Sequence, residues 1–468
     1  MNRSYFLRSS CLLLILIAFP AGCNAPKSDL KKFNNYFKTE YLEGSELEKS
    51  AAFAESKISK GEKPKAESLL WAMQMGCLER IRQNHRESSE YFDKSEEMLN
   101  YFDYQNEAVD SVAAMVVNEN IVPYLGEEYD GIMVNTYKAL NFMVLGQVDL
   151  ARVEFNRALD RQRRAAEKFA KELQKLKNEI DEQQKQEKSQ VKKSIENPEL
   201  REVIESKYPG LYEFEAYGDF VNPFTTYIAG VFFNLVGDHS KATTLFKQSY
   251  GMTGDNQYIA EDLTVTEKIL DGQEELKDTV WVIFENGLGP IKEEFRVDIP
   301  LFVVTDKVKY VGIALPKLVF REQAYPYLAI RAADKDYRTQ LVADMDRVVQ
   351  TEFNKDFEGI LTRAIISATA KAVTQYALEE EGSSGAAIAS IFVAVYSFAT
   401  TTADVRIWTT LPKDFQVARL PIPDDRLVTI TPPGALPFEV KISPCKNAVL
   451  YVRIPFNQAR PVYDLITY

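Results

Sequence analysis

The sequence predicts an α+β fold in which a helical N-terminal half precedes a small antiparallel β domain. Apolar residues recur at helical spacing from about residue 30 to residue 268, with very few β-rich runs. Beyond residue 268, short runs of apolar, aromatic and β-branched residues alternate with prolines and turn residues. The chain has 468 residues, of which 46% are hydrophobic, so it can bury a substantial core in about two or three domains.

Residues 1–22 have the layout of a secretory signal peptide. Arg3 and Arg8 give a positively charged start, the run CLLLILIAF over residues 11–19 is apolar, and small residues follow. An apolar run of this length is too short to cross a bilayer core of ~30 Å. We therefore expect this segment to be absent from the mature protein.

The sequence Ala-Gly-Cys that ends at Cys23 resembles the lipobox of bacterial lipoproteins. In that motif the cysteine thiol is acylated and the cysteine becomes the new N-terminus. Pro20 departs from the pattern, which usually has leucine there. The resemblance implies lipid attachment at Cys23, a tether over residues 23–30, and, because Asn24 follows the cysteine, an outer-membrane anchor facing the periplasm. A plain signal peptide cut elsewhere is the alternative.

Three segments of the predicted helical half share a pattern of small and aromatic residues. Each carries a small, an aromatic and a small residue at positions i, i+4 and i+7, which places all three on one helix face. The trios are Ser88, Phe92 and Ser95; Ala151, Phe155 and Ala158; and Ala242, Phe246 and Ser249. Further small residues precede them at Gly76, Ala139 and Gly230, so neighbouring helices can approach closely.

With turns such as Gly146-Gln147 and Gly237-Asp238, this pattern resembles the tetratricopeptide helix-turn-helix repeat. The segments are irregularly spaced, so we expect residues 31–272 to form divergent tetratricopeptide-like repeats with insertions. An ordinary helical bundle with glycine turns would give the same pattern. Either arrangement presents surfaces for other proteins.

A charged stretch over residues 161–207 interrupts the repeats. Phe169, Leu173, Leu176 and Ile180 follow one another at coiled-coil spacing before the sequence becomes rich in Gln, Lys and Glu. Proline at residue 198 favours a turn there. We expect a projecting helical arm that returns along itself.

Residues 273–468 are predicted to form a small antiparallel sandwich or barrel. The strand-like stretches are WVIFENG, FRVDIPLFVV, YVGIAL, DVRIWTTLP, FQVARLPI, RLVTITPP, FEVKI and AVLYVRIPF. Between them, residues 341–402 are predicted to form an inserted helical hairpin. Its second half, 382–403, carries no charge and is long enough to be considered as a membrane span. We favour a buried helix there because the stretch is rich in Gly, Ala, Ser and Thr.

Three strings resemble an uncharacterised family of bacterial outer-membrane lipoproteins: DFVNPFTTYIAGVFF (219–233), VWVIFENGLGPIKEEF (280–295) and TTADVRIWTTLP (401–412). The matched residues are Asn222, Pro223, Phe224, Tyr227, Gly230, Glu285, Gly287, Pro290, Lys292, Ala403, Asp404, Arg406, Trp408, Leu411 and Pro412. The resemblance covers most of the chain from about residue 137. It implies a tetratricopeptide-like N-terminal half and a genomic neighbourhood that often encodes relatives of the lipoprotein activators of penicillin-binding proteins.

Five of the matched residues are candidate partner-binding residues: Asn222, Tyr227, Asp404, Arg406 and Trp408. The last three are two apart, hence on one side of a predicted strand. An Asp–Arg pair covered by tryptophan could recognise a polar ligand. The alternative is a structural ion pair that closes the junction between helix and sheet.

Neither catalysis nor a cofactor is expected. Glu285, Lys292, Glu293 and Glu294 lie close in sequence, but adjacent carboxylates on a strand point to opposite sides. The chain has only two histidines and no CxxC, HExxH, GxSxG, SxxK or P-loop pattern. No metal site is therefore predicted, and Cys77 and Cys445 are expected to be free thiols.

The net charge of −12 excludes nucleic acid and anionic headgroups as favoured partners. The sequence thus favours a non-enzymatic, lipid-anchored periplasmic scaffold that binds protein partners, in the regulation or assembly of cell-wall synthesis. A subunit of an outer-membrane export assembly is the alternative, and a cell-wall hydrolase is the least favoured.

Overall fold

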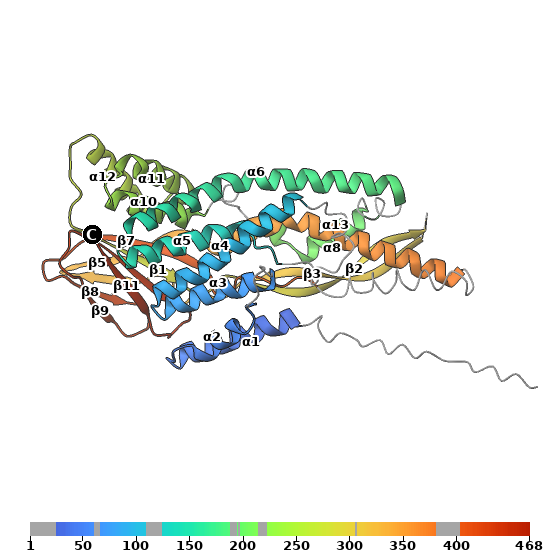
Figure 1. Cartoon of the computed structure of the whole chain (residues 1–468), viewed down its shortest axis with the longest axis horizontal. Helices are drawn as coiled ribbons and strands as arrows, with labels where there is room; N and C mark the ends of the chain where they lie inside the picture. Colours follow the sequence, from blue (N-terminus) through green and yellow to red (C-terminus); the bar gives the residue numbers. More distant parts are fainter. Residues whose placement is uncertain are drawn as a thin grey trace, which may run out of the picture.

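The computed structural model describes residues 25–59, 66–108, 124–187, 194, 197–213, 222–304, 307–380 and 403–468 (Figure 1). It is a mixed helix and sheet fold, 52% helical and 22% strand, which confirms the α+β class. Cys23 and the signal segment lie outside the described residues. Residues 381–402 of the predicted insert lie outside them as well. Within the described part, no helix combines the length and apolarity needed to span a membrane.

The helical half occupies the described residues before 272. Its helices are α1 (Ala25–Leu42), α2 (Glu48–Glu55), α3 (Ala66–Ile81), α4 (His85–Ala108), α5 (Glu128–Val144), α6 (Val148–Glu187), α8 (Pro198–Lys207), α9 (Gly210–Glu213), α10 (Pro223–Leu235), α11 (His239–Thr253) and α12 (Gln257–Leu270). The pairs α3–α4, α5–α6 and α10–α11 are hairpins that contain the three segments with the shared pattern.

The hairpins turn in the same way. Gly146 and Gly237 have positive φ angles of 68° and 81°, and Gln83 takes the same conformation, at 62°, in the first hairpin. In each turn the amide of the following residue donates to a carbonyl five residues back, as from Gln147 to Phe142 at 2.8 Å. This left-handed ending satisfies the last carbonyls of the first helix and reverses the chain.

The small residues of the shared pattern let the paired helices touch. A Cβ atom added at Gly76 would lie 2.4 Å from the Phe92 ring, and one added at Gly230 would lie 2.8 Å from the Phe246 ring. In the middle hairpin Ala139 is completely buried. The phenylalanine of each second helix therefore fills the space that the small residue of the first helix leaves open.

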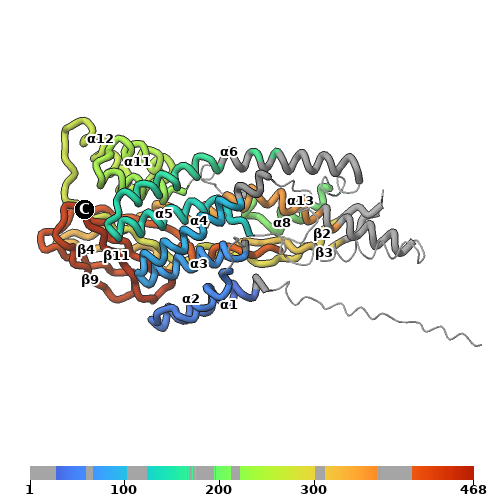
Figure 2. The backbone as a smooth tube through the Cα atoms, in the orientation of Figure 1, coloured from blue at the N-terminus to red at the C-terminus, as the bar shows by residue number. Residues whose placement is uncertain are grey.

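Helix α6 continues for 40 residues, so the predicted arm begins as an unbroken extension of the second hairpin. The chain then turns at Asn197, whose side chain caps α8. The side chains of the predicted seam, Phe169, Leu173, Leu176 and Ile180, lie outside those that are described. Figures 1 and 2 show α6, α13 and the β2–β3 hairpin extending in the same direction from the main sheet.

The β-rich half has three sheets and one long helix. Its elements are β1 (Thr279–Asn286), β2 (Ile291–Val304), β3 (Lys307–Val319), β4 (Ala329–Ala332), β5 (Lys335–Arg338), β6 (Gln340–Asp344), α13 (Met345–Glu380), β7 (Asp414–Pro421), β8 (Leu427–Thr431), β9 (Phe438–Lys441), β10 (Asn447–Ile454) and β11 (Val462–Thr467). The sheets have the orders β11-β10-β1-β7-β6, β2-β3 and β5-β4-β8-β9.

The structure corrects three details of the predicted β domain. Strands β1 and β10 pair in parallel, so the main sheet is mixed rather than antiparallel. Residues 341–344 belong to β6, which pairs with β7, and the helix of the insert begins only at Met345. The predicted strand DVRIWTTLP is irregular: its apolar and β-branched residues are buried, but residues 404–408 join no strand ladder.

The two halves share one hydrophobic core. The ring of Phe224 in α10 stacks on Phe415 in β7 with centroids 3.5 Å apart. Just beyond the end of β10, the ring of Phe456 lies 5.7 Å from the ring of Phe37 in α1. The predicted regions 31–272 and 273–468 are therefore packed against each other through buried aromatic side chains.

Candidate functional site

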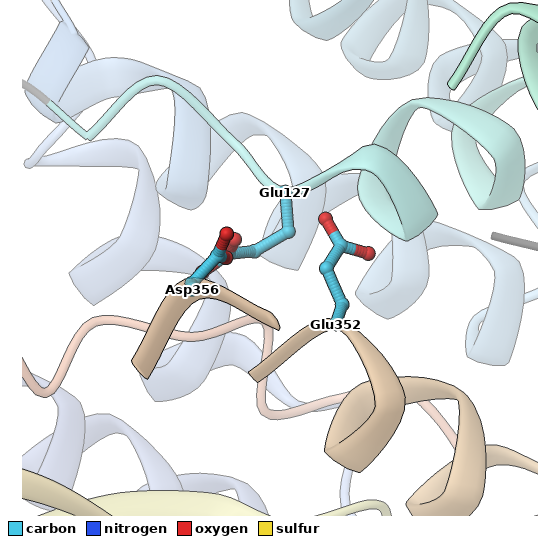
Figure 3. Close-up of side chains that lie close together, drawn as sticks. All are labelled: Glu127, Glu352 and Asp356. Carbon is cyan, nitrogen blue, oxygen red and sulfur yellow. The ribbon is translucent and has the colours of Figure 1, made fainter. Parts of the chain in front are cut away.

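Three carboxylates meet where the start of α5 approaches α13 (Figure 3). Glu127 precedes α5, whereas Glu352 and Asp356 lie one helical turn apart on α13. One carboxylate oxygen from each residue lies within 4.8 Å of the other two. These three residues are called the acidic cluster below. Glu352 is 6% exposed, and the other two are partly buried.

The free amides in the first turn of α5 explain why the Glu352 carboxylate lies next to this helix end. The first amides of a helix have no partner within the helix and favour negative charge nearby. Glu352 accepts a hydrogen bond from the Glu128 amide and a second, at 3.2 Å, from the Tyr129 amide. The Asp130 carboxylate accepts from the Glu127 amide at 2.9 Å. Two carboxylates from different parts of the chain thus cap α5.

Lys292 of β2 completes the surroundings of the cluster. Its ammonium nitrogen lies 2.8 Å from Glu127 Oε1. Burial opposes the charged form of Lys292, but the negative charges of Glu127 and Asp404 outweigh it and raise the pKa of the lysine above its usual value. Lys292 is therefore a permanent cation that links the β2–β3 hairpin to α5.

Burial makes Glu352 and Asp130 weak acids. It raises the pKa of Glu352 well above its usual value, and the charges of Glu127 and Asp356 raise it further. Burial likewise raises the pKa of Asp130 to about 7, against the hydrogen bonds from the Tyr124 hydroxyl and the Glu127 amide. Concentrated negative charge in a buried place favours uptake of positive charge, either as protons or as a metal ion.

A second polar cluster joins the helical half to the main sheet. Arg453 Nη1 lies 3.0 Å from Glu285 Oε1, and the Tyr137 hydroxyl donates to the same oxygen at 3.1 Å. The Tyr451 hydroxyl donates to the other oxygen. Each of the four residues is less than 5% exposed. Glu285 of β1 therefore forms a buried ion pair with Arg453 of β10, and the Tyr137 hydroxyl connects this pair to α5.

Two of the predicted partner-binding residues are buried at α10, one at its N-cap and one within the helix. Asn222 is fully buried and caps the helix, accepting from the Phe224 amide at 3.0 Å and the Thr225 amide at 3.4 Å. The hydroxyl of Tyr227, which is also fully buried, donates to Asp262 Oδ2 at 2.7 Å. Both side chains hold helices together.

Asp404 and Arg406 form the ion pair that was the alternative to ligand recognition. Arg406 donates to the two Asp404 oxygens at 2.8 and 2.6 Å. Because the segment is not a strand, Trp408 does not cover the pair: it packs between Phe92 and Tyr137, and the Arg406 guanidinium lies over the Tyr124 ring. Arg406 and Trp408 are 8% and 1% exposed, so a partner would reach little of either side chain.

The acidic cluster was not predicted from the sequence. The spacing of Glu352 and Asp356 does place both carboxylates on one face of a helix. Nothing local, however, indicates that Glu127 joins them, because more than two hundred residues separate it from α13. Cys77 and Cys445 are free, as expected, although Cys445 is only partly buried.

The comparisons with known proteins identify no family for this chain. No family model matches the sequence, and neither a curated protein nor a solved structure matches it.

Proposed function

We propose that the chain is a lipid-anchored scaffold of the bacterial outer membrane that faces the periplasm and binds protein partners. Three helical hairpins support this proposal most directly: α3–α4, α5–α6 and α10–α11. They have the same turn and the same small and aromatic pattern, and they pack with a mixed sheet. We interpret them as divergent tetratricopeptide-like repeats, which bind proteins through their exposed faces. Cys23 would supply the anchor.

The cellular context is part of the same proposal. It rests on the resemblance of the three sequence strings, which implies a role in the regulation or assembly of cell-wall synthesis. Asn222, Tyr227, Asp404, Arg406 and Trp408 then act by shaping the scaffold from inside, since four of them are buried. The exposed faces of the hairpins would meet the partner.

The test is a crosslinked pull-down from cells that carry the tagged full-length protein. Cys23→Ser is the control for the anchor. We expect recovery of a cell-wall synthase or its activator with the parent chain and loss of that recovery without the cysteine. Labelling with a radioactive fatty acid should mark the parent chain and leave the Cys23→Ser variant unlabelled.

A surface variant sharpens the test. Leu150 and Val153 lie three residues apart near the start of α6 and are 46% and 43% exposed, so a partner could contact both side chains. Leu150→Asp should weaken crosslinking to the partner if the hairpins bind it. Leu436→Asp, in the β8–β9 turn, where the leucine is 89% exposed, is the matched control and should leave crosslinking unchanged.

The export-assembly alternative predicts a different result. It draws on the uncharged stretch 382–403, which lies outside the described residues apart from Ala403. Recovery of pore or secretion subunits, with the Cys23→Ser chain still in the membrane, would contradict the scaffold proposal. Clearing of purified sacculi by the chain would instead show a hydrolase and contradict the proposal that it is not an enzyme.

A further inference from the structure

We propose that Glu127, Glu352 and Asp356 bind one divalent cation, with calcium the ion of best fit, and that this ion fastens the start of α5 to α13. The site would take a hard cation, because all three protein ligands are carboxylate oxygens. The inference is independent of the scaffold role, since it concerns how the fold itself is held together.

The spacing of the three carboxylates fits calcium. Calcium–oxygen distances are about 2.4 Å, so two ligands on opposite sides of the ion are about 4.8 Å apart. The three cluster oxygens lie within this same limit, 4.8 Å, of one another. Magnesium requires near-ideal octahedral geometry and gives up its water reluctantly, whereas calcium accepts the irregular geometry that carboxylates from two separate elements provide.

Two buried polar atoms beside the cluster need a partner that the described residues do not supply. The Tyr129 hydroxyl and Asp130 Oδ1 make no hydrogen bond within the described part of the chain, although Tyr129 is 2% exposed and Asp130 is completely buried. Burial raises the pKa of the Tyr129 hydroxyl, and the negative charges of Asp130 and of all three cluster carboxylates raise it further. Buried polar atoms are nearly always paired, so their position next to the cluster indicates a missing ligand.

A hydrated cation satisfies these atoms as a set. Calcium usually keeps water molecules in addition to its protein ligands. A water bound to the ion could accept from the Tyr129 hydroxyl, and the same or another water could donate to Asp130 Oδ1.

Lys292 does not replace the ion. Its ammonium group bonds to Glu127 Oε1, and a carboxylate has further lone pairs for a metal. The backbone amides hold Glu352 in a fixed position, and one helical turn fixes Asp356 relative to it. The ligands are therefore held by elements of the fold, so little ordering is required when the ion binds.

The test is metal binding by the purified full-length chain after treatment with a chelator. Calcium, magnesium and manganese are titrated separately by calorimetry, and terbium is used as a luminescent substitute for calcium, excited through Tyr129. We expect saturable calcium binding at one site and a sensitised terbium signal. Calcium should also raise the Tm, because an ion that binds only the folded state stabilises it.

Three variants make the test specific. Glu352→Gln and Asp356→Asn each remove a charged ligand with little change in shape and should weaken calcium binding at least roughly 10–100-fold. Glu358→Gln makes the same chemical change on an exposed position of α13 and should bind like the parent. Circular dichroism of each variant establishes that it is folded. If Glu352→Gln unfolds because its bonds to α5 are weakened, the calcium affinity of Asp356→Asn provides the test instead.

The outcomes separate cleanly. Calcium binding that is lost in both ligand variants and kept in Glu358→Gln supports the site. Absence of saturable binding by the parent chain, or equal binding by parent and ligand variants, overturns it. Tighter binding of magnesium than of calcium overturns the assignment to calcium. None of these results depends on the anchor or on a protein partner.

Discussion

Gly230 and Gly251 are two helical glycines that the fold uses in opposite ways. Gly230 faces the Phe246 ring across the α10–α11 hairpin, where an added Cβ would lie 2.8 Å from the ring. Gly251 lies on the exposed side of α11 with nothing within 4 Å. Sequence alone predicted the first role, because Gly230 belongs to the small and aromatic pattern.

We predict opposite effects of alanine at these two glycines. Gly230→Ala should lower the free energy of unfolding by roughly 1–2 kcal/mol, since overpacking outweighs the better helix propensity of alanine. Gly251→Ala should raise it by up to about 1 kcal/mol, because only the propensity term remains. Denaturant titration of both variants measures the difference. A change of the same sign in both would contradict the close packing of α10 on α11.

Asp414 makes the stability of the sheet depend on pH. Burial raises its pKa to about 7, although the amides of Asn286 and Gln416 donate to it; the nearby Asp344 charge raises the pKa and Lys413 lowers it. The pKa of an unfolded aspartate is about 3.9. The folded state therefore holds this proton more tightly, so its stabilising effect is lost as pH rises from about 4 to 7.

Asp414→Asn should remove this dependence. Relative to the parent, the variant should gain roughly 2–4 kcal/mol of unfolding free energy between pH 4 and pH 8. The comparison has to be made as a difference between the two chains, because Asp130, Asp262 and Asp346 also have raised pKa values. Denaturant titrations across this pH range provide the measurement. A difference that stays constant with pH would show that Asp414 does not titrate there.

Two helices begin at the same Asn-Pro motif. Asn222 and Asn197 each precede a proline and cap a helix, α10 and α8 respectively. The Asn222 cap is completely buried, whereas the Asn197 bond to the Glu199 amide is exposed. The same motif therefore has a larger energetic role in the core than on the surface.

Replacing each cap by alanine tests that difference. Asn222→Ala should cost roughly 2 kcal/mol, because it removes the cap and leaves buried amides without an acceptor. Asn197→Ala should cost about 0.5–1 kcal/mol, since water can replace the lost acceptor. Thermal unfolding of the two variants gives the comparison. Equal costs would mean that burial of the α10 cap has no energetic consequence.

The strand predictions were wrong for segments that have the composition of a strand but do not pair with one, and for a short strand next to a helix. The β-branched and aromatic residues around Arg406 and Trp408 read as a strand, yet this segment is buried between helices without joining a ladder. Similarly, the segment predicted to be helical from residue 341 begins with β6, which has only five residues, two adjacent buried positions and an irregular pairing between Leu341 and Ala343. Such short or two-sided segments take their conformation from tertiary contacts, and local propensity does not reveal them.

On the scale of the whole molecule, long-range polar contacts were beyond sequence prediction. Glu285 and Tyr451 are 166 residues apart, and Glu128 and Glu352 are 224 apart. The pattern of apolar residues could indicate which elements are buried, but it could not indicate which charges meet between them. Both polar clusters lie where the helical half meets the β-rich half, so the sequence predicted the two halves and missed what joins them.

The Glu285–Arg453 pair should therefore couple the unfolding of both halves. Arg453→Met would leave Glu285 buried without its cation and should cost roughly 3–5 kcal/mol. Arg331→Met breaks an exposed pair with Asp336 and should have little effect. Hydrogen exchange should become faster in α5 as well as in β10 for Arg453→Met, because the Tyr137 hydroxyl and the Phe92–Tyr137–Trp408 rings tie α5 to the sheet core. Faster exchange confined to β10 would show instead that the helical half is stable without the sheet, and that the shared core does not make the chain one cooperative unit.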